Sequence, residues 1–185
     1  MAMRLVMLML MALAWPARAE PVAGFAADGW PILAALTEVS VATDNRIGGD
    51  CWAQEDAART AVGEALSISG FRLVGQGEVG GDPELQAFLT IGAFGHVTET
   101  GNCIVVLELD AEHLLTYRIP GEESRLARSN LLVWHDSSVL SGPADGLSEV
   151  IMVEALGLAQ GFALAVEAAR NRAVAERPGP GLSSD

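Results

Sequence analysis

The chain has 185 residues and a formal net charge of −13, because 24 acidic residues face 11 arginines and there is no lysine. A surface this acidic repels phosphate backbones and anionic lipid headgroups. The composition therefore argues against nucleic-acid binding and favours another envelope protein or a neutral or cationic ligand as partner. The same charge would also keep an exported protein in solution without binding anything.

The first 19 residues have the three parts of a secretory signal peptide. Arg4 supplies the positive start, an apolar run follows over 5–15, and Ala17-Arg18-Ala19 precedes a cleavage point at Glu20. The apolar run is shorter than the ~20 residues that a bilayer span requires, so an uncleaved anchor is the less favoured alternative. We expect a periplasmic protein, with secretion beyond the periplasm left open, and no transmembrane helix in the mature chain.

Three further segments complete the expected organisation. Residues 20–35 are expected to be irregular because proline and glycine interrupt short apolar pieces. Residues 36–176 are expected to form a single α+β domain. The end of the chain, 177–185, is rich in proline, glycine and serine and is expected to be a flexible tail.

The first half of the domain alternates between strand and helix signals. Alternating, β-branched residues predict a strand over 36–43. Apolar residues at helical spacing predict a helix over 53–69, which Gly70 ends. A short strand over 71–74 and a glycine-rich loop over 75–83 follow. This loop lacks the Gly-Lys-Ser/Thr ending of a phosphate-binding loop.

The second half is dominated by strands and ends in a long helix. Residue alternation predicts extended segments over 85–98, 103–109, 114–119 and 130–139. Gly101 marks the turn of a hairpin. Helical periodicity then extends over 146–176, with Asp145 as the N-cap.

The two cysteines of the chain, Cys51 and Cys103, are expected to form a disulfide, because paired cysteines are usual in small exported proteins. Such a bridge stabilises a domain by about 4 kcal/mol for a loop of this length. A free buried pair and a metal site are the alternatives.

These elements predict an α+β fold with a mostly antiparallel sheet, two helices packed on one face, and one disulfide. Each helix carries one apolar stripe, and a sheet face is what such stripes bury. The disulfide would tie the start of the first helix to the hairpin.

Several segments resemble a loose class of small exported bacterial proteins of unknown function with a β-α-β-β-β-α layout. They are Cys51-Trp52-Ala53-Gln54-Glu55-Asp56, Phe71-Arg72-Leu73-Val74, Asn102-Cys103-Ile104-Val105-Val106, and Trp134 followed by Ser141-Gly142-Pro143-Ala144. The order of elements is also similar, at fold level only, to the lipopolysaccharide-assembly lipoprotein and related envelope modules. This chain lacks the lipid-bearing cysteine of those lipoproteins. The resemblance implies no activity for any residue.

The candidate chemical groups are few. His135-Asp136-Ser137 contains the residue types of a serine hydrolase, but on a strand Asp136 faces away from the other two. His96, His113 and His135 could meet as a metal site only if the sheet brought them together. Glu154 falls on the apolar stripe of the last helix. Either it is a buried acid with a partner such as Arg72 or Arg118, or the helix is rotated so that Glu154 faces the solvent. Trp52, like Trp30 and Trp134, is expected to be a core or rim residue, and a partner surface near it is the alternative.

The absence of a catalytic, cofactor or metal motif favours a non-catalytic binding or envelope-assembly module without a cofactor. Its partner surface would lie on an uncovered sheet face or near Trp52. The alternative is a small envelope enzyme that uses His135 or His113 with a nearby acid. A purely structural, stress-related envelope protein is a third possibility.

Export is expected to remove residues 1–19 and to oxidise both cysteines. The intact mass of the protein recovered from its native envelope should equal that of a chain beginning at Glu20, less two hydrogens. Alkylation of Cys51 or Cys103 in the denatured, unreduced protein would contradict the disulfide.

Overall fold

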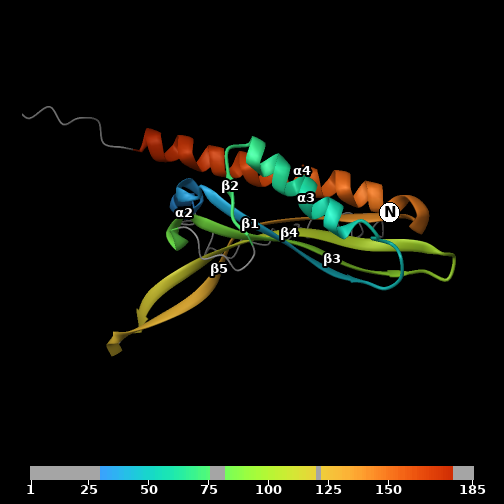
Figure 1. The fold of residues 1–185 in the computed structure, drawn as a ribbon, viewed down its shortest axis with the longest axis horizontal. Coiled ribbons are helices and arrows are strands. Elements are labelled where there is room, and N and C mark those ends of the chain that lie inside the picture. The colour runs from blue at the N-terminus through green and yellow to red at the C-terminus, as the bar shows by residue number, and fades with distance from the viewer. Residues whose placement is uncertain (1–29, 76–81, 120–121, 177–185) are drawn as a thin grey trace, which may run out of the picture.

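A computed structural model describes residues 30–75, 82–119 and 122–176 (Figure 1). The predicted signal peptide and C-terminal tail lie outside the described residues, as does most of the glycine-rich loop. The described elements occur in the order expected from the sequence, with one additional helix at the start.

The sheet has five strands in the order β2-β1-β3-β4-β5. The strands are β1 (Glu38–Ile47), β2 (Arg72–Leu73), β3 (Gln86–Val97), β4 (Asn102–Ile119) and β5 (Glu122–Pro143). β1 pairs in parallel with both β2 and β3, whereas β3–β4 and β4–β5 are antiparallel.

The sheet is therefore mixed, and the prediction of a mostly antiparallel sheet is wrong. The reason lies in the connection after β1, where the chain passes through α3 (Glu55–Ile68) before it returns to the sheet. A crossover through a helix brings the next strand back in the same direction. β2 is so short that most of the parallel pairing is between β1 and β3.

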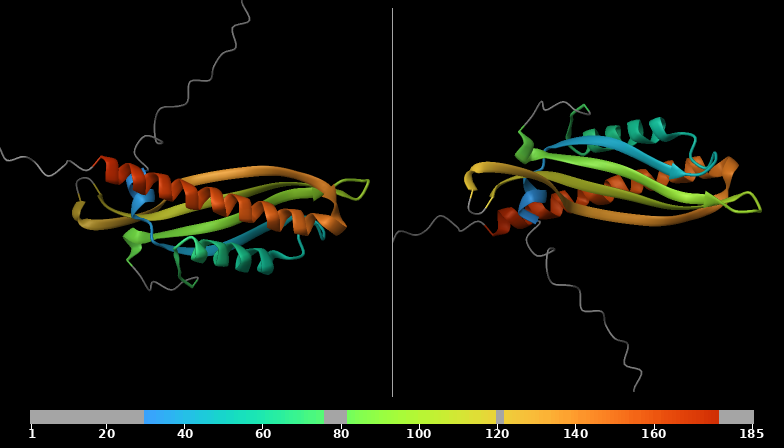
Figure 2. Two further views of the ribbon diagram at one scale, coloured as in Figure 1. Left: turned by 90° about the horizontal axis from the view of Figure 1, so that it is seen from above. Right: turned by 90° about the horizontal axis from the view of Figure 1, so that it is seen from below.

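Both long helices, α3 and α4 (Ala144–Ala175), cover the same face of the sheet, as predicted (Figure 2). A short helix, α2 (Trp30–Ala35), lies against α4. It occupies the end of a segment that we expected to be irregular. The Arg172 guanidinium lies 4.7 Å from the centre of the Trp30 ring, which joins α2 to the last turns of α4.

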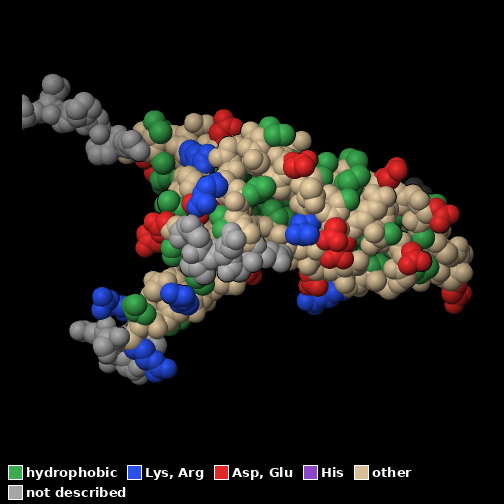
Figure 3. Space-filling model, viewed as in Figure 1, with side chains coloured by type: hydrophobic (Ala, Val, Ile, Leu, Met, Phe, Trp, Pro, Cys, Tyr) green, Lys and Arg blue, Asp and Glu red, His purple; other side chains and the backbone are tan. Residues whose placement is uncertain are grey.

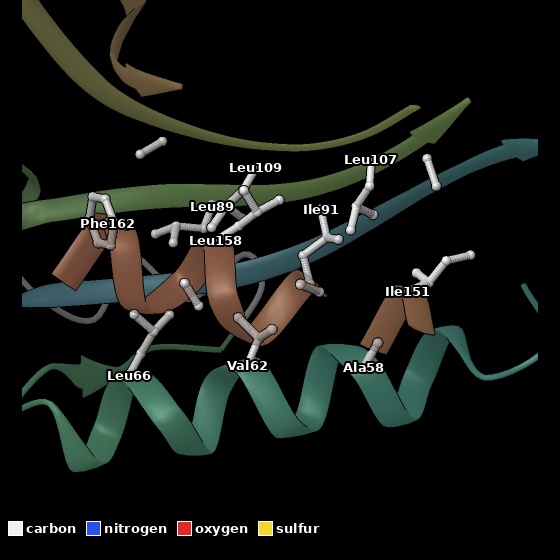
Figure 4. Packing of buried hydrophobic residues seen from close by; sticks show 14 of the residues in the cluster. Ala58, Val62, Leu66, Leu89, Ile91, Leu107, Leu109, Ile151, Leu158 and Phe162 are labelled. Atoms are coloured by element: carbon white, nitrogen blue, oxygen red, sulfur yellow. The ribbon is translucent and has the colours of Figure 1, made fainter. Parts of the chain in front are cut away.

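Alternation along the central strands explains this one-sided core (Figure 4). Side chains at odd-numbered positions are buried against the helices from Ala87 to Ala93 on β3 and from Cys103 to His113 on β4. Apolar side chains on the predicted faces of α3 and α4 meet them. Phe162 of α4 is fully buried, with its ring stacked 5.5 Å from Phe71 and edge-on at 5.6 Å to Trp134. This aromatic cluster connects α4 to both edges of the sheet.

The predicted disulfide Cys51–Cys103 is present, with both residues fully buried. A second link reinforces it, since the Ser148 hydroxyl accepts a hydrogen bond from the Ala53 N–H at 2.9 Å and lies 3.4 Å from the Cys51 carbonyl oxygen. The segment before α3 is thus attached to β4 covalently and to the first turns of α4 by hydrogen bonds. Gly70 ends α3 with a φ of +92°, as the glycine stop predicted.

β4 and β5 form a long hairpin that was not predicted, because β4 is continuous where two separate segments were expected and β5 begins at Glu122 rather than near residue 130. β3 pairs with β4 only as far as His113, so residues 114–119 pair with β5 alone. The resulting two-stranded ribbon projects beyond the helices (Figure 1). Where Ala111 and Glu112 meet β5, an extra residue, Val133, forms a bulge.

Helix α4 is uncapped by a side chain, since Pro143 occupies the N-cap position expected for Asp145. Among the helices in the described ranges, α4 is the one whose length and composition would suit a membrane span. A helix in the core of a protein meets the same criterion, and one flank of α4 is buried against the sheet. This finding is weak evidence for a span.

Replacement of Phe162 by alanine should lower the free energy of unfolding by about 3–5 kcal/mol, because it removes the aromatic centre of the core. Chemical denaturation followed by tryptophan fluorescence measures the change. Leu164→Ala is the matched control, since Leu164 is 65% exposed on the same helix; its effect should stay within about 0.5 kcal/mol. Equal effects of the two substitutions would contradict the described packing of α4.

Candidate functional site

No described helix covers the second face of the sheet, which we call the open face (Figure 2). Side chains at even-numbered positions of β1, β3 and β4 project from it, because alternate residues of a strand point to opposite faces. The register of the strands therefore defines which of them are neighbours.

Three carboxylates follow one another along β4 on the open face: Glu108, Asp110 and Glu112, which we call the acid row. Residues two apart on a strand are about 6.7 Å apart. Asp110 lies 2.6 Å from His135 Nδ1, and Glu112 accepts a hydrogen bond of 2.8 Å from the Asn130 side chain. In the described part of the chain, no arginine forms an ion pair with the acid row.

An apolar band borders each end of the acid row. At one end, Phe88 and Leu132 are the register neighbours of Glu112 on the two adjacent strands. At the other end, Val106 lies between Phe94 and Val139. Leu132 and Val139 are 53% and 74% exposed, so these bands are accessible.

A charged pair limits the open face on the β1 side. The Arg46 guanidinium lies 5.3 Å from the centre of the Phe94 ring and forms an ion pair of 2.7 Å with Asp44. The hydrogen bond to Asp44, followed by the Asp44 charge, raises the pKa of Arg46. The positive charge of Arg46 therefore balances the negative charge of Asp44 and does not neutralise the acid row.

The enzyme hypothesis requires an acid and a nucleophile beside His135. The described residues place an acid there, but no nucleophile. Asp136 lies on the opposite face of β5, as predicted, and Asp110 of the neighbouring strand binds the His135 ring instead. Ser137 shares the face of His135, yet its hydroxyl makes no hydrogen bond to that ring within the described residues. His135 lines none of the four described hollows. The pair can bind a charged or hydrogen-bonding ligand, but among the described residues no nucleophile is arranged beside it for acyl transfer.

The three histidines do not converge. His113 is 5% exposed and lies on the helix side of the sheet, where its Nδ1 is 3.0 Å from the Gln86 carbonyl oxygen. His96 is the register neighbour of Ile104, six residues along β4 from Asp110, which corresponds to about 20 Å. Within the described ranges, no group of three or more potential ligands is placed to hold a metal ion.

His113 lines a cleft of about 340 Å³ between α2, the 3-10 turn Pro83–Leu85 and β4. A larger groove of about 550 Å³ lies between the ends of α3 and α4. There the Arg170 guanidinium lies 5.6 Å from the centre of the Phe71 ring and donates to the Leu36 carbonyl. Arg170 is thus committed to the core and does not define an anion site.

The surroundings of Glu154 differ from those expected, whereas Trp52 lies in the core as expected. Glu154 is partly buried, and its carboxylate accepts a hydrogen bond from the Ser138 hydroxyl; neither Arg72 nor Arg118 is its described partner. Arg72 is ion-paired with Glu38. Trp52 is 3% exposed next to the disulfide, so it contributes to the core and offers no surface to a partner.

Sequence reasoning missed the acid row as a unit. The signal was present, because Glu108, Asp110 and Glu112 alternate with buried Leu109 and Ala111 in the sequence. Its meaning depended on knowing that residues 103–119 form one strand. The predicted break between 109 and 114 concealed the alternation.

Comparison with known proteins adds little to this description. No family model and no curated protein matches the chain. Among solved structures, the PelC dodecamer from Paraburkholderia phytofirmans shares 14% identity, with 66% of this chain and 86% of that chain covered and a TM-score of 0.40. A homologue of neuraminyllactose-binding hemagglutinin from Helicobacter pylori shares 11% identity, with 75% and 90% covered and a TM-score of 0.34.

A third solved structure, titled only as an uncharacterised protein, shares 15% identity over 75% of this chain and 93% of that chain, with a TM-score of 0.29. These similarities are too weak to carry an argument about function. They are consistent with the expected resemblance to uncharacterised proteins, and they give no support to the expected similarity to the lipopolysaccharide-assembly lipoprotein.

The His135–Asp110 pair should contribute little to stability, because the two side chains are 44% and 37% exposed. Asp110→Asn should therefore change the free energy of unfolding by no more than about 1 kcal/mol. Urea denaturation tests this expectation. A loss of several kcal/mol would mean that the open face is covered in solution and that the pair is buried.

Proposed function

We propose that the chain is an exported, non-catalytic binding module whose open sheet face receives a cationic, partly apolar partner. The observation that carries the proposal is the acid row, Glu108, Asp110 and Glu112, on an uncovered strand at the centre of the domain. On β1 the face also carries Asp44, which is paired with Arg46, and Glu38, which is paired with Arg72. Arginines gather on the projecting ribbon, beyond the acid row (Figure 3).

Electrostatics supports a cation as the ligand. Two carboxylates about 6.7 Å apart repel each other by about 0.6 kcal/mol even at the dielectric constant of water. A cation placed between them relieves this repulsion. No described arginine performs that function within the chain.

The apolar bands support an extended ligand that is also partly apolar. Each band joins an exposed aliphatic side chain to a half-buried phenylalanine, and the acid row lies between the two bands. Exposed apolar groups next to a charged strip are typical of interaction surfaces. An extended basic segment of another envelope protein has this combination of properties.

In the described part of the chain, none of the four hollows is lined by the acid row or by His135, which favours a binding role over a catalytic one. Enzymes usually enclose their reacting groups in a concave site. The His135–Asp110 pair lies on a flat sheet, and the described clefts are elsewhere.

A defined peptide tests the proposal. A decapeptide of alternating lysine and valine, when extended, places lysines about 6.7 Å apart and so matches the spacing of the acid row. Calorimetric titration should detect binding that weakens as salt is added. The triple variant Glu108→Gln, Asp110→Asn, Glu112→Gln should weaken this binding at least about tenfold, since three exposed charge pairs are lost.

The matched control is Glu64→Gln, Glu149→Gln, Glu167→Gln, which removes the same charge from exposed positions on α3 and α4. Its affinity for the peptide should stay close to that of the unmodified protein. Equal weakening by the two triple variants would mean that only net charge attracts the peptide, and the open face would lose its assigned role.

A further inference from the structure

β5 is an edge strand, and its outer side has no backbone partner within the described residues. Unpaired N–H and C=O groups on a strand edge accept another strand readily. Natural proteins usually protect such edges with charges, prolines or bulges. One stretch of β5 lacks these features and is bordered by them at its two ends.

The unprotected stretch is Ser138–Gly142, which we call the β5 edge strip. It begins after Asp136, whose carboxylate already accepts the Ser137 N–H at 2.8 Å, and it ends at Pro143, which has no N–H to donate. No charged residue occurs between Asp136 and Asp145. Val139, the second residue of the strip, is 74% exposed.

Helix α4 runs beside this strip and presents a second charge-poor surface on the same side (Figure 2). Two observations identify the side of α4 that faces β5. The Glu154 carboxylate accepts a hydrogen bond from Ser138, and a Cβ built on Gly161 would lie 3.6 Å from the Trp134 ring. Helical spacing places Val150, Gly157 and Ala168 on the outer part of that side, which we call the α4 flank. Val150 is 49% exposed, and a Cβ built on Gly157 would meet no atom within 4 Å.

We propose that the β5 edge strip and the α4 flank together form a two-fold interface with a second copy of this chain. An antiparallel pair of β5 strands satisfies its own backbone groups, because the same strand supplies donors and acceptors on both sides. The two α4 helices then approach each other above the joined sheets, where glycine and alanine allow a close helix contact.

The charge of the molecule favours a second copy at this place over others on its surface. A chain with a net charge of −13 repels itself, so a copy can approach most easily where carboxylates are absent or already bound. On this side the Glu154 carboxylate is occupied by the Ser138 hydroxyl. The opposite edge consists of the short β2 and, beyond it, of β1, which bears the charged pair Asp44 and Arg46 and is less suited to strand pairing.

The acid rows of the two copies would not prevent this arrangement. β4 and its counterpart would be separated by both β5 strands, which at about 4.8 Å per strand places the rows about 14 Å apart. This distance exceeds the Debye length of about 8 Å at physiological salt. The two open faces would lie side by side in one continuous sheet.

Sedimentation equilibrium of the purified protein over about 1–100 µM tests the proposal. The expected result is a monomer–dimer equilibrium. Val139→Lys places like charges across the two-fold axis, and Gly157→Glu adds both bulk and charge to the helix contact. Each substitution should raise the dimer dissociation constant at least about tenfold.

The control is Ile68→Lys, which adds the same charge at a position that is 88% exposed on α3. It should leave the dimer unchanged. Circular dichroism and thermal unfolding should show that all variants remain folded. A monomer at every concentration, a dimer that resists both substitutions, or assemblies larger than a dimer would overturn the proposal. The Gly157→Glu variant leaves the open face unchanged, so titration of this variant with the lysine–valine decapeptide tests the binding role of the open face independently of the dimer.

Discussion

Burial of only one face of the sheet is the constraint on which the rest of this structure depends. Phe162 and its neighbours on α4, together with the inner face of α3, cover the odd-numbered side chains of β3 and β4. The even-numbered side chains of β4 are thereby left partly or fully exposed to the solvent. A two-layer domain of this kind gains its hydrophobic stabilisation from one interface and keeps a whole sheet face for other contacts.

Elements that contribute to that interface could be predicted from the sequence. Elements that do not contribute to it could not. The helix ended by Gly70, the alternation of β3 and the disulfide were predictable, because burial imposes a period on the residues. The start of β5, before residue 130, could not be predicted, since a ribbon exposed on both sides has no apolar face. The parallel pairing of β1 was also missed, because pairing direction is determined by the crossover connection.

The candidate site was predictable only in outline. The acidic composition indicated a neutral or cationic partner, and the two apolar helix stripes indicated that one sheet face is left uncovered. The pairing of His135 with Asp110 required the register of β4 and β5. Trp52 is buried beside the disulfide, as expected of a tryptophan in the core, and a partner surface near it is not present in the described residues.

The projecting part of the β4–β5 hairpin has a consequence for motion within the native state. Beyond His113, β4 is held by β5 alone, so the amides of this ribbon lack the second neighbour that protects the centre of the sheet. Such segments open locally, without global unfolding. Amide hydrogen exchange should therefore become progressively faster from the body of the domain towards the turn, which makes the hairpin a flexible extension on a rigid, disulfide-linked base.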